Sequence, residues 1–298
     1  MTIAGAIDFS IERAAVANAL TGAADRYLAS LPADVAAAMR YAMAGEGKRL
    51  RAILFHSAYR AAGGDRDAWA LAAAIEIVHA YSLVHDDLPC MDDDAMRRGR
   101  PTVHKAFGVA VATAAGLAMV PLAARAALDG AREIGLDEAQ AGDVVRELMR
   151  AAGASGMIGG QLLDLEGEGE HLSLERLERI HALKTGALIA ASVRLGGLAA
   201  CAHDDVLAAL DRYGRCVGLA FQIADDVLDV TATSEQLGKT AGRDVALHKS
   251  TYPALLGIDG AVARASALAD EACAALQAVS QLTPALEYLA RYSVERKA

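Results

Sequence analysis

Residues 221–230 read FQIADDVLDV and place three aspartates and one glutamine among apolar neighbours. A helix advances about 100° per residue, so the four polar side chains fall within roughly 100° of one another: Gln222, Asp225, Asp226 and Asp229. Carboxylates on one helix face repel each other, and an apolar context does not suit a solvated acidic face. With no His or Cys nearby, these hard oxygen donors indicate Mg²⁺ rather than Zn²⁺.

The rest of the chain favours helices throughout. Of its 298 residues, 54% are hydrophobic, only 4% are aromatic, and 6 are Pro. Long stretches consist of Ala, Leu, Glu and Arg, which form helices readily, whereas strand-forming residues are sparse. Short Gly, Pro or Asp segments separate the helical blocks, and no linker divides the chain. We therefore predict an all-α fold in one domain, residues 1–298.

Charge and cysteine content limit the binding partners and the cellular compartment that the protein can be expected to have. The formal net charge of −9 is opposite in sign to that of a typical nucleic-acid binder, so we expect no nucleic-acid partner. The 4 cysteines form no C-x-x-C pair and are expected to be reduced thiols. Residues 1–15 carry two acids and no basic start, unlike a signal peptide. These features predict a cytoplasmic protein.

Residues 106–124 contain no charged side chain and are long enough to cross a membrane. They are mostly Ala and Gly and poor in Leu, Ile and Phe, which lowers their value as a membrane anchor. We expect a buried core or subunit-interface helix here and no membrane span.

A second carboxylate cluster lies in residues 83–102, LVHDDLPCMDDDAMRRGRPT. Its five acids follow an apolar run and precede Arg97 and Arg98: Asp86, Asp87, Asp92, Asp93 and Asp94. Asp86 and Asp87 directly follow this apolar run, and buried or half-buried unpaired carboxylates are costly, so a bound metal again explains these two better than a solvated face.

Basic residues gather in a few places. Residues 45–51, GEGKRLR, put Lys48 and Arg51 on one helix face after two glycines, which suits either a phosphate site or a solvated basic turn. Lys184 lies in an apolar helical stretch, where a lone Lys is unusual, and Lys239 follows the FQIADDVLDV segment. Two acidic metal sites and scattered cations indicate a Mg²⁺-dependent enzyme that acts on diphosphates.

These motifs together resemble the trans-isoprenyl diphosphate synthases, and among them the bacterial farnesyl type. DDLPCMD is similar to the first Asp-rich motif of that family, GEGKRLR to its isopentenyl diphosphate motif, and FQIADDVLD to its second Asp-rich motif. KTG and LGKTAGRD complete the series in the family's order. The resemblance implies helices around a central cavity, with the two Asp-rich motifs facing each other across its mouth, and a homodimer.

The resemblance also implies roles for individual residues. Magnesium ions on the allylic diphosphate would be held by Asp86, Asp92 and Asp225, and further metal or water ligands would be Asp87, Asp226 and Asp229. The cations that grip this diphosphate would be Arg97, Lys184 and Lys239. Thr185 and Gln222 would line the region where the carbocation forms. Isopentenyl diphosphate would be bound by Lys48, Arg51, His79 and Arg98.

The implied reaction is ionisation, condensation and elimination. Positive charges stabilise the departing diphosphate, the double bond of isopentenyl diphosphate attacks the allylic cation, and a proton is lost to the departed diphosphate. Tyr81 and Ser82 lie five and four residues before the first Asp, where the family shapes the floor of its chain pocket. A bulky Tyr81 predicts a farnesyl (C15) product, although the residue also suits an ordinary core position.

Two departures and several alternatives remain. The family often has Gly-Asp-Ala-Leu where residues 116–119 read GLAM, so Leu117 replaces an Asp, and Ala52 replaces a Pro. A geranylgeranyl (C20) or shorter-chain synthase would carry the same motifs. A terpene cyclase would replace the second Asp-rich motif, and a partner subunit of a heteromeric prenyltransferase usually loses one. A plain helical interaction protein would not explain the acidic faces.

Overall fold

The computed structural model describes residues 7–45, 47–231 and 250–295. Its described part confirms the all-α prediction, since one short antiparallel pair, β1 (Met96–Arg97) with β2 (Arg100–Pro101), is the only sheet found there. Contacts divide the chain into two compact units. The first unit comprises Asp8–His56 and Asp65–Leu148, and the second comprises Met1–Ile7, Ser57–Gly64 and Met149–Ala298.

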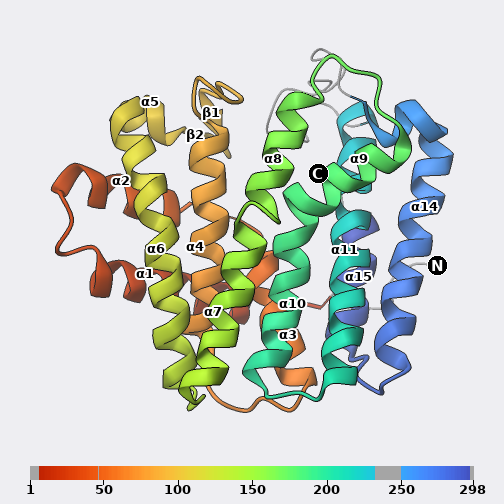
Figure 1. Ribbon diagram of the computed structural model, residues 1–298, viewed down its shortest axis with the longest axis horizontal. Coiled ribbons are helices and arrows are strands. Elements are labelled where there is room, and N and C mark those ends of the chain that lie inside the picture. The colour runs from red at the N-terminus through yellow and green to blue at the C-terminus, as the bar shows by residue number, and fades with distance from the viewer. Residues whose placement is uncertain (1–6, 46, 232–249, 296–298) are drawn as a thin grey trace. The chain divides into compact units, whose positions relative to one another are not determined.

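The first unit is built around α4 (Trp69–Asp86), which packs against α6 (Val109–Glu133) along much of its length (Figure 1). Its other helices are α1 (Ser10–Tyr27), α2 (Ala33–Met43) and α5 (Val103–Phe107). Gly130 permits the close approach of α6 to α4, because an added Cβ there would lie 2.8 Å from the backbone nitrogen of Leu71. This packing buries most of α4 and leaves its C-terminal end to carry the first Asp-rich motif.

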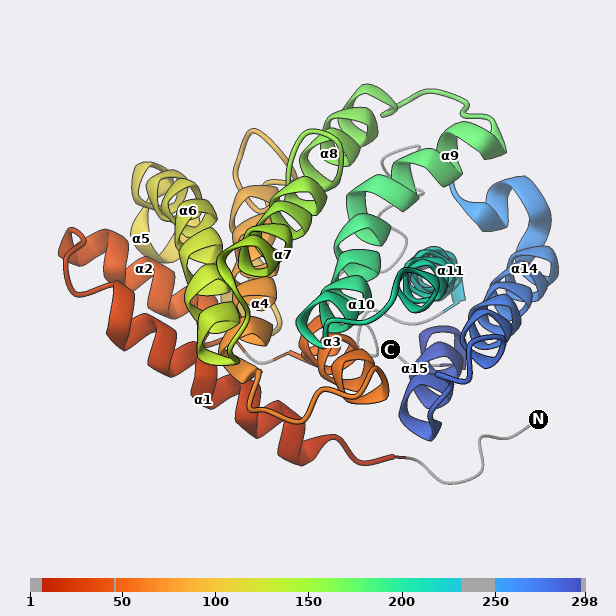
Figure 2. The same ribbon diagram turned by 60° about the horizontal axis from the view of Figure 1, so that its bottom comes forward.

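The second unit centres on α11 (Asp204–Thr231), which lies between α10 (Ala187–Ala199) and α14 (Tyr252–Gln277) in both views (Figures 1 and 2). It also contains α8 (Met157–Glu166), α9 (Leu174–His181) and α15 (Pro284–Glu295). Two helices, α3 (Leu50–Ala61) and α7 (Glu138–Ala152), contribute residues to both units.

A five-residue π-helical turn, η1 (Ala182–Gly186), joins α9 to α10 and contains the KTG motif. This turn packs closely against glycines of α8 and α11. An added Cβ at Gly160 of α8 would overlap the backbone of Lys184, and one at Gly218 of α11 would lie 2.8 Å from the Cα of Gly186. Turns of this kind occur often at functional sites.

Two stretches are long and apolar enough to be candidate membrane spans by length and composition alone: Val109–Glu133 and Leu174–Ala199. The first contains most of the uncharged run 106–124. In the most apolar windows, 39% and 61% of the residues are buried inside the structure, as expected of helices that also pack in a core. They are weak indications of a membrane protein.

Candidate active site

In the first unit, the turn between β1 and β2 positions the arginines of the RRGRP sequence. Arg98 and Gly99 both have positive φ, 52° and 73°, as required at the centre of a two-residue hairpin turn. An added Cβ at Gly47 would lie 2.5 Å from Nη1 of Arg98, so the glycine in the GEGKRLR loop makes room for this guanidinium. The structure thus brings the isopentenyl diphosphate motif and Arg98 together.

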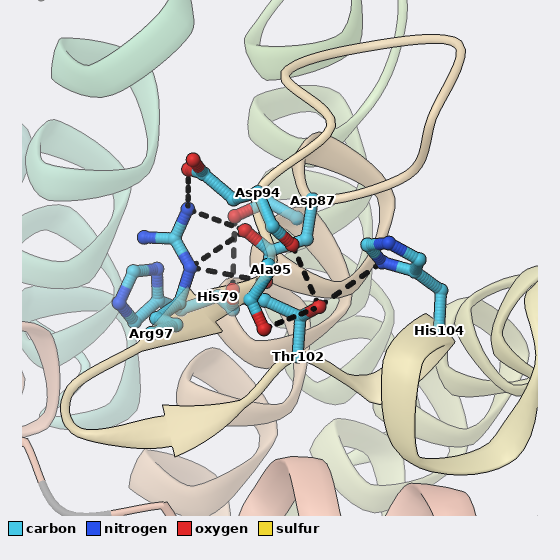
Figure 3. Close-up of polar contacts among 8 residues, drawn as sticks. His79, Asp87, Asp94, Ala95, Arg97, Thr102 and His104 are labelled. Carbon is cyan, nitrogen blue, oxygen red and sulfur yellow. Dashed lines mark hydrogen bonds and ion pairs between the residues drawn. The ribbon is translucent and has the colours of Figure 1, made fainter.

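Arg97 faces the first Asp-rich motif. Its Nε donates to both carboxylate oxygens of Asp87, at 2.8 and 3.0 Å, and its Nη2 lies 2.6 Å from Oδ1 of Asp87 and 3.6 Å from Asp94 (Figure 3). Asp87 is buried, and burial raises its carboxyl pKa despite the opposing effect of Arg97. Asp87 therefore holds Arg97 in place rather than extending into solvent.

Backbone hydrogen bonds close the loop that carries Asp86 and Asp92. The N–H of Asp92 donates to the carbonyl oxygen of Asp86 at 2.9 Å, which keeps the two residues at the ends of one tight loop. Thr102 fixes the far end, since its Oγ1 donates to the carbonyl oxygen of Asp94 at 2.7 Å and lies 3.1 Å from Nδ1 of His104 (Figure 3). Asp86 and Asp92 are both half-buried.

His79 lies in the same cluster, two helical turns before Asp86 on α4 (Figure 3). Burial lowers its pKa well below the usual value, and the charges of Arg51 and Arg98 lower it further. His79 is therefore neutral at pH 7 and can offer a hydrogen bond, not a charge, to a phosphate.

Arg49 has a supporting role that the sequence did not reveal. Its guanidinium donates to the carbonyl oxygens of Met43 and Gly45, at 3.1 and 2.7 Å, and to Glu76 at 3.4 Å. Glu76 is 2% exposed and also accepts from the N–H of Ala52. This anchor fixes the loop in which Lys48 is exposed and Arg51 half-buried.

In the second unit, the KTG motif and the second Asp-rich motif are linked directly. Oγ1 of Thr185 donates to Oε1 of Gln222 at 2.9 Å, and Nε2 of Gln222 donates to Oδ1 of Asp226 at 3.2 Å. Lys184 lies 2.6 Å from Oδ2 of Asp164 on α8. Four of these side chains, those of Asp164, Lys184, Gln222 and Asp226, line an open pocket of about 560 Å³ together with His181 and Thr251.

Asp226 is held from its other side as well. It is 2% exposed, and its Oδ2 accepts from the backbone N–H of Tyr252 at 3.1 Å and lies 3.4 Å from Nε2 of His181. The rings of His181 and Tyr252 stack, with centroids 5.7 Å apart and planes 18° from parallel. Asp229 is buried too, whereas Asp225 is half-buried.

Three residues that contact Lys184 or Asp226 were missed from the sequence: Asp164, His181 and Tyr252. His181 lies three residues before Lys184, and Asp164 lies one turn after Gly160, but a single sequence gives no signal that either meets the aspartates. Lys239 lies outside the residues that the structure describes, so its predicted role stays a prediction.

The carboxylates fit a hard cation. Asp86, Asp92 and Asp225 offer only oxygen donors and are less buried than Asp87, Asp226 and Asp229. Within the described residues, no group of three His, Cys, Asp or Glu side chains forms a complete metal centre. The carboxylates of each unit, taken by themselves, suit an ion that bridges one or two carboxylates to a substrate phosphate.

Comparison with known proteins places the chain in a family. The polyprenyl synthetase family matches residues 32–289. The chain belongs to the polyprenyl synthetase family. It is 44% identical over 298 residues to farnesyl diphosphate synthase of Escherichia coli, covering 97% of this chain and 99% of the relative. It is 42% identical over 255 residues to the chloroplastic geranylgeranyl pyrophosphate synthase of Catharanthus roseus, covering 85% and 71%.

Solved structures agree with this assignment. A geranyltransferase from Helicobacter pylori, in complex with magnesium and isoprenyl diphosphate, superposes with a TM-score of 0.80 at 30% identity, covering 97% of both chains. Membership of the polyprenyl synthetase family makes the chain a prenyltransferase of isoprene biosynthesis. The resemblance seen in the motifs is thereby confirmed at the level of the family.

Proposed function

We propose that the chain is a farnesyl diphosphate synthase. It would condense isopentenyl diphosphate head to tail (1′–4) with dimethylallyl or geranyl diphosphate, giving (2E,6E)-farnesyl diphosphate and diphosphate. The observation that carries the C15 assignment is Tyr81, a large aromatic residue that is 8% exposed and packs edge-on against His85. The near full-length similarity to the E. coli farnesyl enzyme supports the same product.

Each proposed site residue would either stabilise the charge of a substrate or orient a substrate. Asp86, Asp92 and Asp225 would hold Mg²⁺, which when bound neutralises the diphosphate charge that develops on ionisation. Arg97 and Lys184, held in place by Asp87 and Asp164, would add positive charge at the allylic diphosphate. Thr185 and Gln222 would present oxygens to the carbocation, and Lys48, Arg51, Arg98 and neutral His79 would orient isopentenyl diphosphate. The basic cluster around His79, formed by Arg49, Arg51, Arg97 and Arg98, supports diphosphate binding at this place.

The test is product analysis. The protein is incubated with Mg²⁺, isopentenyl diphosphate and either allylic starter, and the dephosphorylated alcohol is identified by gas chromatography and mass spectrometry. Farnesol is expected, and Asp225→Ala should abolish it. Geranylgeraniol would instead make the chain a C20 synthase, as the similarity to the C. roseus enzyme allows. No condensation would favour a partner subunit of a heteromeric prenyltransferase.

We further propose a single-domain, cytoplasmic homodimer that contacts its partner through the outer face of α6. Val109 and Leu117 on this face are 49% and 61% exposed, although both are large and apolar. Leu117, which replaces an Asp of the family, therefore lies outside the packed core of the first unit. Light scattering on the purified protein should give twice the chain mass, and Leu117→Glu should shift it toward the monomer.

A further inference from the structure

Gly116, on the buried face of α6, lies against His85 in the last turn of α4. A Cβ added at Gly116 would overlap the imidazole ring of His85, at Nε2 and Cδ2. Gly116 is buried, so the ring occupies the volume that any other residue would need. The absence of a side chain at position 116 thus determines where the imidazole can lie.

His85 is fixed on two further sides. Its Nε2 lies 3.3 Å from the carbonyl oxygen of Thr113, one turn before Gly116. Its ring meets Tyr81 in a T-shaped contact, with centroids 5.0 Å apart and planes 72° from parallel. Tyr81 and His85 are four residues apart on α4 and share a face of the helix. The contact sequence therefore runs from Gly116 through His85 to Tyr81.

We propose that Gly116 and His85 are specificity-determining residues that set product length by positioning Tyr81. This inference rests on the proposed function, in which Tyr81 forms the floor of the chain pocket. Gly116 lets the imidazole settle against α6, and the imidazole supports one edge of the tyrosine ring. Neither residue needs to touch the diphosphates to have this effect.

The two positions should act in opposite directions. A methyl group at position 116 displaces the imidazole away from α6 and toward Tyr81, which moves the floor inward and shortens the product. Removal of the imidazole leaves Tyr81 without its edge support, so the ring can yield to a longer chain. Interiors are close-packed, so a displacement of one ring is passed on to the next.

The experiment compares product ratios among variants under the conditions of the product analysis above, with dimethylallyl diphosphate as the starter so that every C10 alcohol comes from a product. Gly116→Ala is expected to raise the C10-to-C15 ratio at least tenfold, and His85→Ala to raise the C20-to-C15 ratio by a similar factor. The double variant Gly116→Ala/His85→Ala should lose the shift toward C10, because no imidazole remains to be displaced. Gly142→Ala on α7 is the matched control, since an added Cβ there meets nothing within 4 Å, and its products should equal those of the wild type.

Wild-type product ratios in folded Gly116→Ala would overturn the proposal, with folding checked by circular dichroism. If that variant does not fold, His85→Ala decides alone, because it removes atoms and introduces no overlap; an unchanged C15 product would then overturn the proposal. Failure of the wild-type chain to condense its substrates would refute the proposed function instead, so the two outcomes are distinguishable.

Discussion

Lys184 and Asp164 form an ion pair across two helices, with Nζ 2.6 Å from Oδ2. The pair is partly buried, and it holds the ammonium at the pocket where the allylic diphosphate is proposed to bind. Asp164→Asn keeps the side-chain size but removes the charge that positions Lys184. A charge-assisted hydrogen bond contributes about 1.5–3 kcal/mol, so we expect kcat/KM for the allylic substrate to fall at least tenfold.

Steady-state kinetics with geranyl diphosphate would measure this loss, and Asp211→Asn, in an exposed i,i+4 pair with Arg215 on α11, is a suitable control. Equal kinetics in the wild type and Asp164→Asn would show that Lys184 is positioned by something else.

His181 is predicted to support Asp226. His181→Phe would preserve the stacking on Tyr252 but remove the nitrogen 3.4 Å from Oδ2. We expect the Mg²⁺ concentration for half-maximal activity to rise by about tenfold or more, in line with the losses seen when supporting partners of metal ligands are removed. The midpoint of thermal unfolding should change little. A variant with unchanged Mg²⁺ dependence but a lower midpoint would assign His181 to packing alone.

His79 predicts a pH dependence of stability. The pKa of His79 is lowered in the folded chain. Below about pH 6.5, His79 therefore binds a proton in the unfolded chain but stays neutral in the folded chain. The free energy of unfolding should therefore fall between pH 7 and pH 5, by about 2 kcal/mol from this residue. His79→Gln should remove that part of the fall and keep a neutral hydrogen-bonding group for isopentenyl diphosphate.

Urea unfolding of the wild type and His79→Gln at both pH values gives the difference. Equal losses in the two proteins would contradict a depressed pKa at His79.

Substitution of Arg98 by glycine should lower activity and raise stability. Its φ of 52° is unfavourable for a residue with a Cβ, by about 1–2 kcal/mol. Arg98→Gly relieves this strain and removes a guanidinium from the basic cluster. We expect the unfolding free energy to increase by about 1 kcal/mol while KM for isopentenyl diphosphate rises at least tenfold. Arg98→Asn, which tolerates positive φ, serves as the control, and a loss of both properties would assign Arg98 to structure.

The helices and the main polar faces follow from local sequence. The spacing of Gln222, Asp225 and Asp226 alone predicts a shared face, and the structure links Gln222 and Asp226 directly. Such a pattern depends only on helical periodicity, which neighbouring residues determine.

Contacts between distant segments could not be predicted in the same way. Arg97 pairs with Asp87 because the loop between them folds back on itself, with the N–H of Asp92 bonded to the carbonyl oxygen of Asp86, and Asp164 meets Lys184 through packing of α8 on η1. Arg49 and Lys48 are adjacent cations, yet Arg49 is a half-buried anchor and Lys48 an exposed charge, and only their surroundings make this difference. These distinctions depend on tertiary geometry.

The π-helical turn at Ala182–Gly186 contains one residue more than α-helical winding would require. A single-residue deletion within it would restore regular winding and still leave α9 continuous with α10. Because the wide turn itself absorbs the extra residue, α9 and α10 would keep nearly the same orientation about the helix axis, and only the residues of the turn would change position. Such a deletion would separate Lys184 from Asp164 on α8 and Thr185 from Gln222 on α11 while the surrounding helices persist.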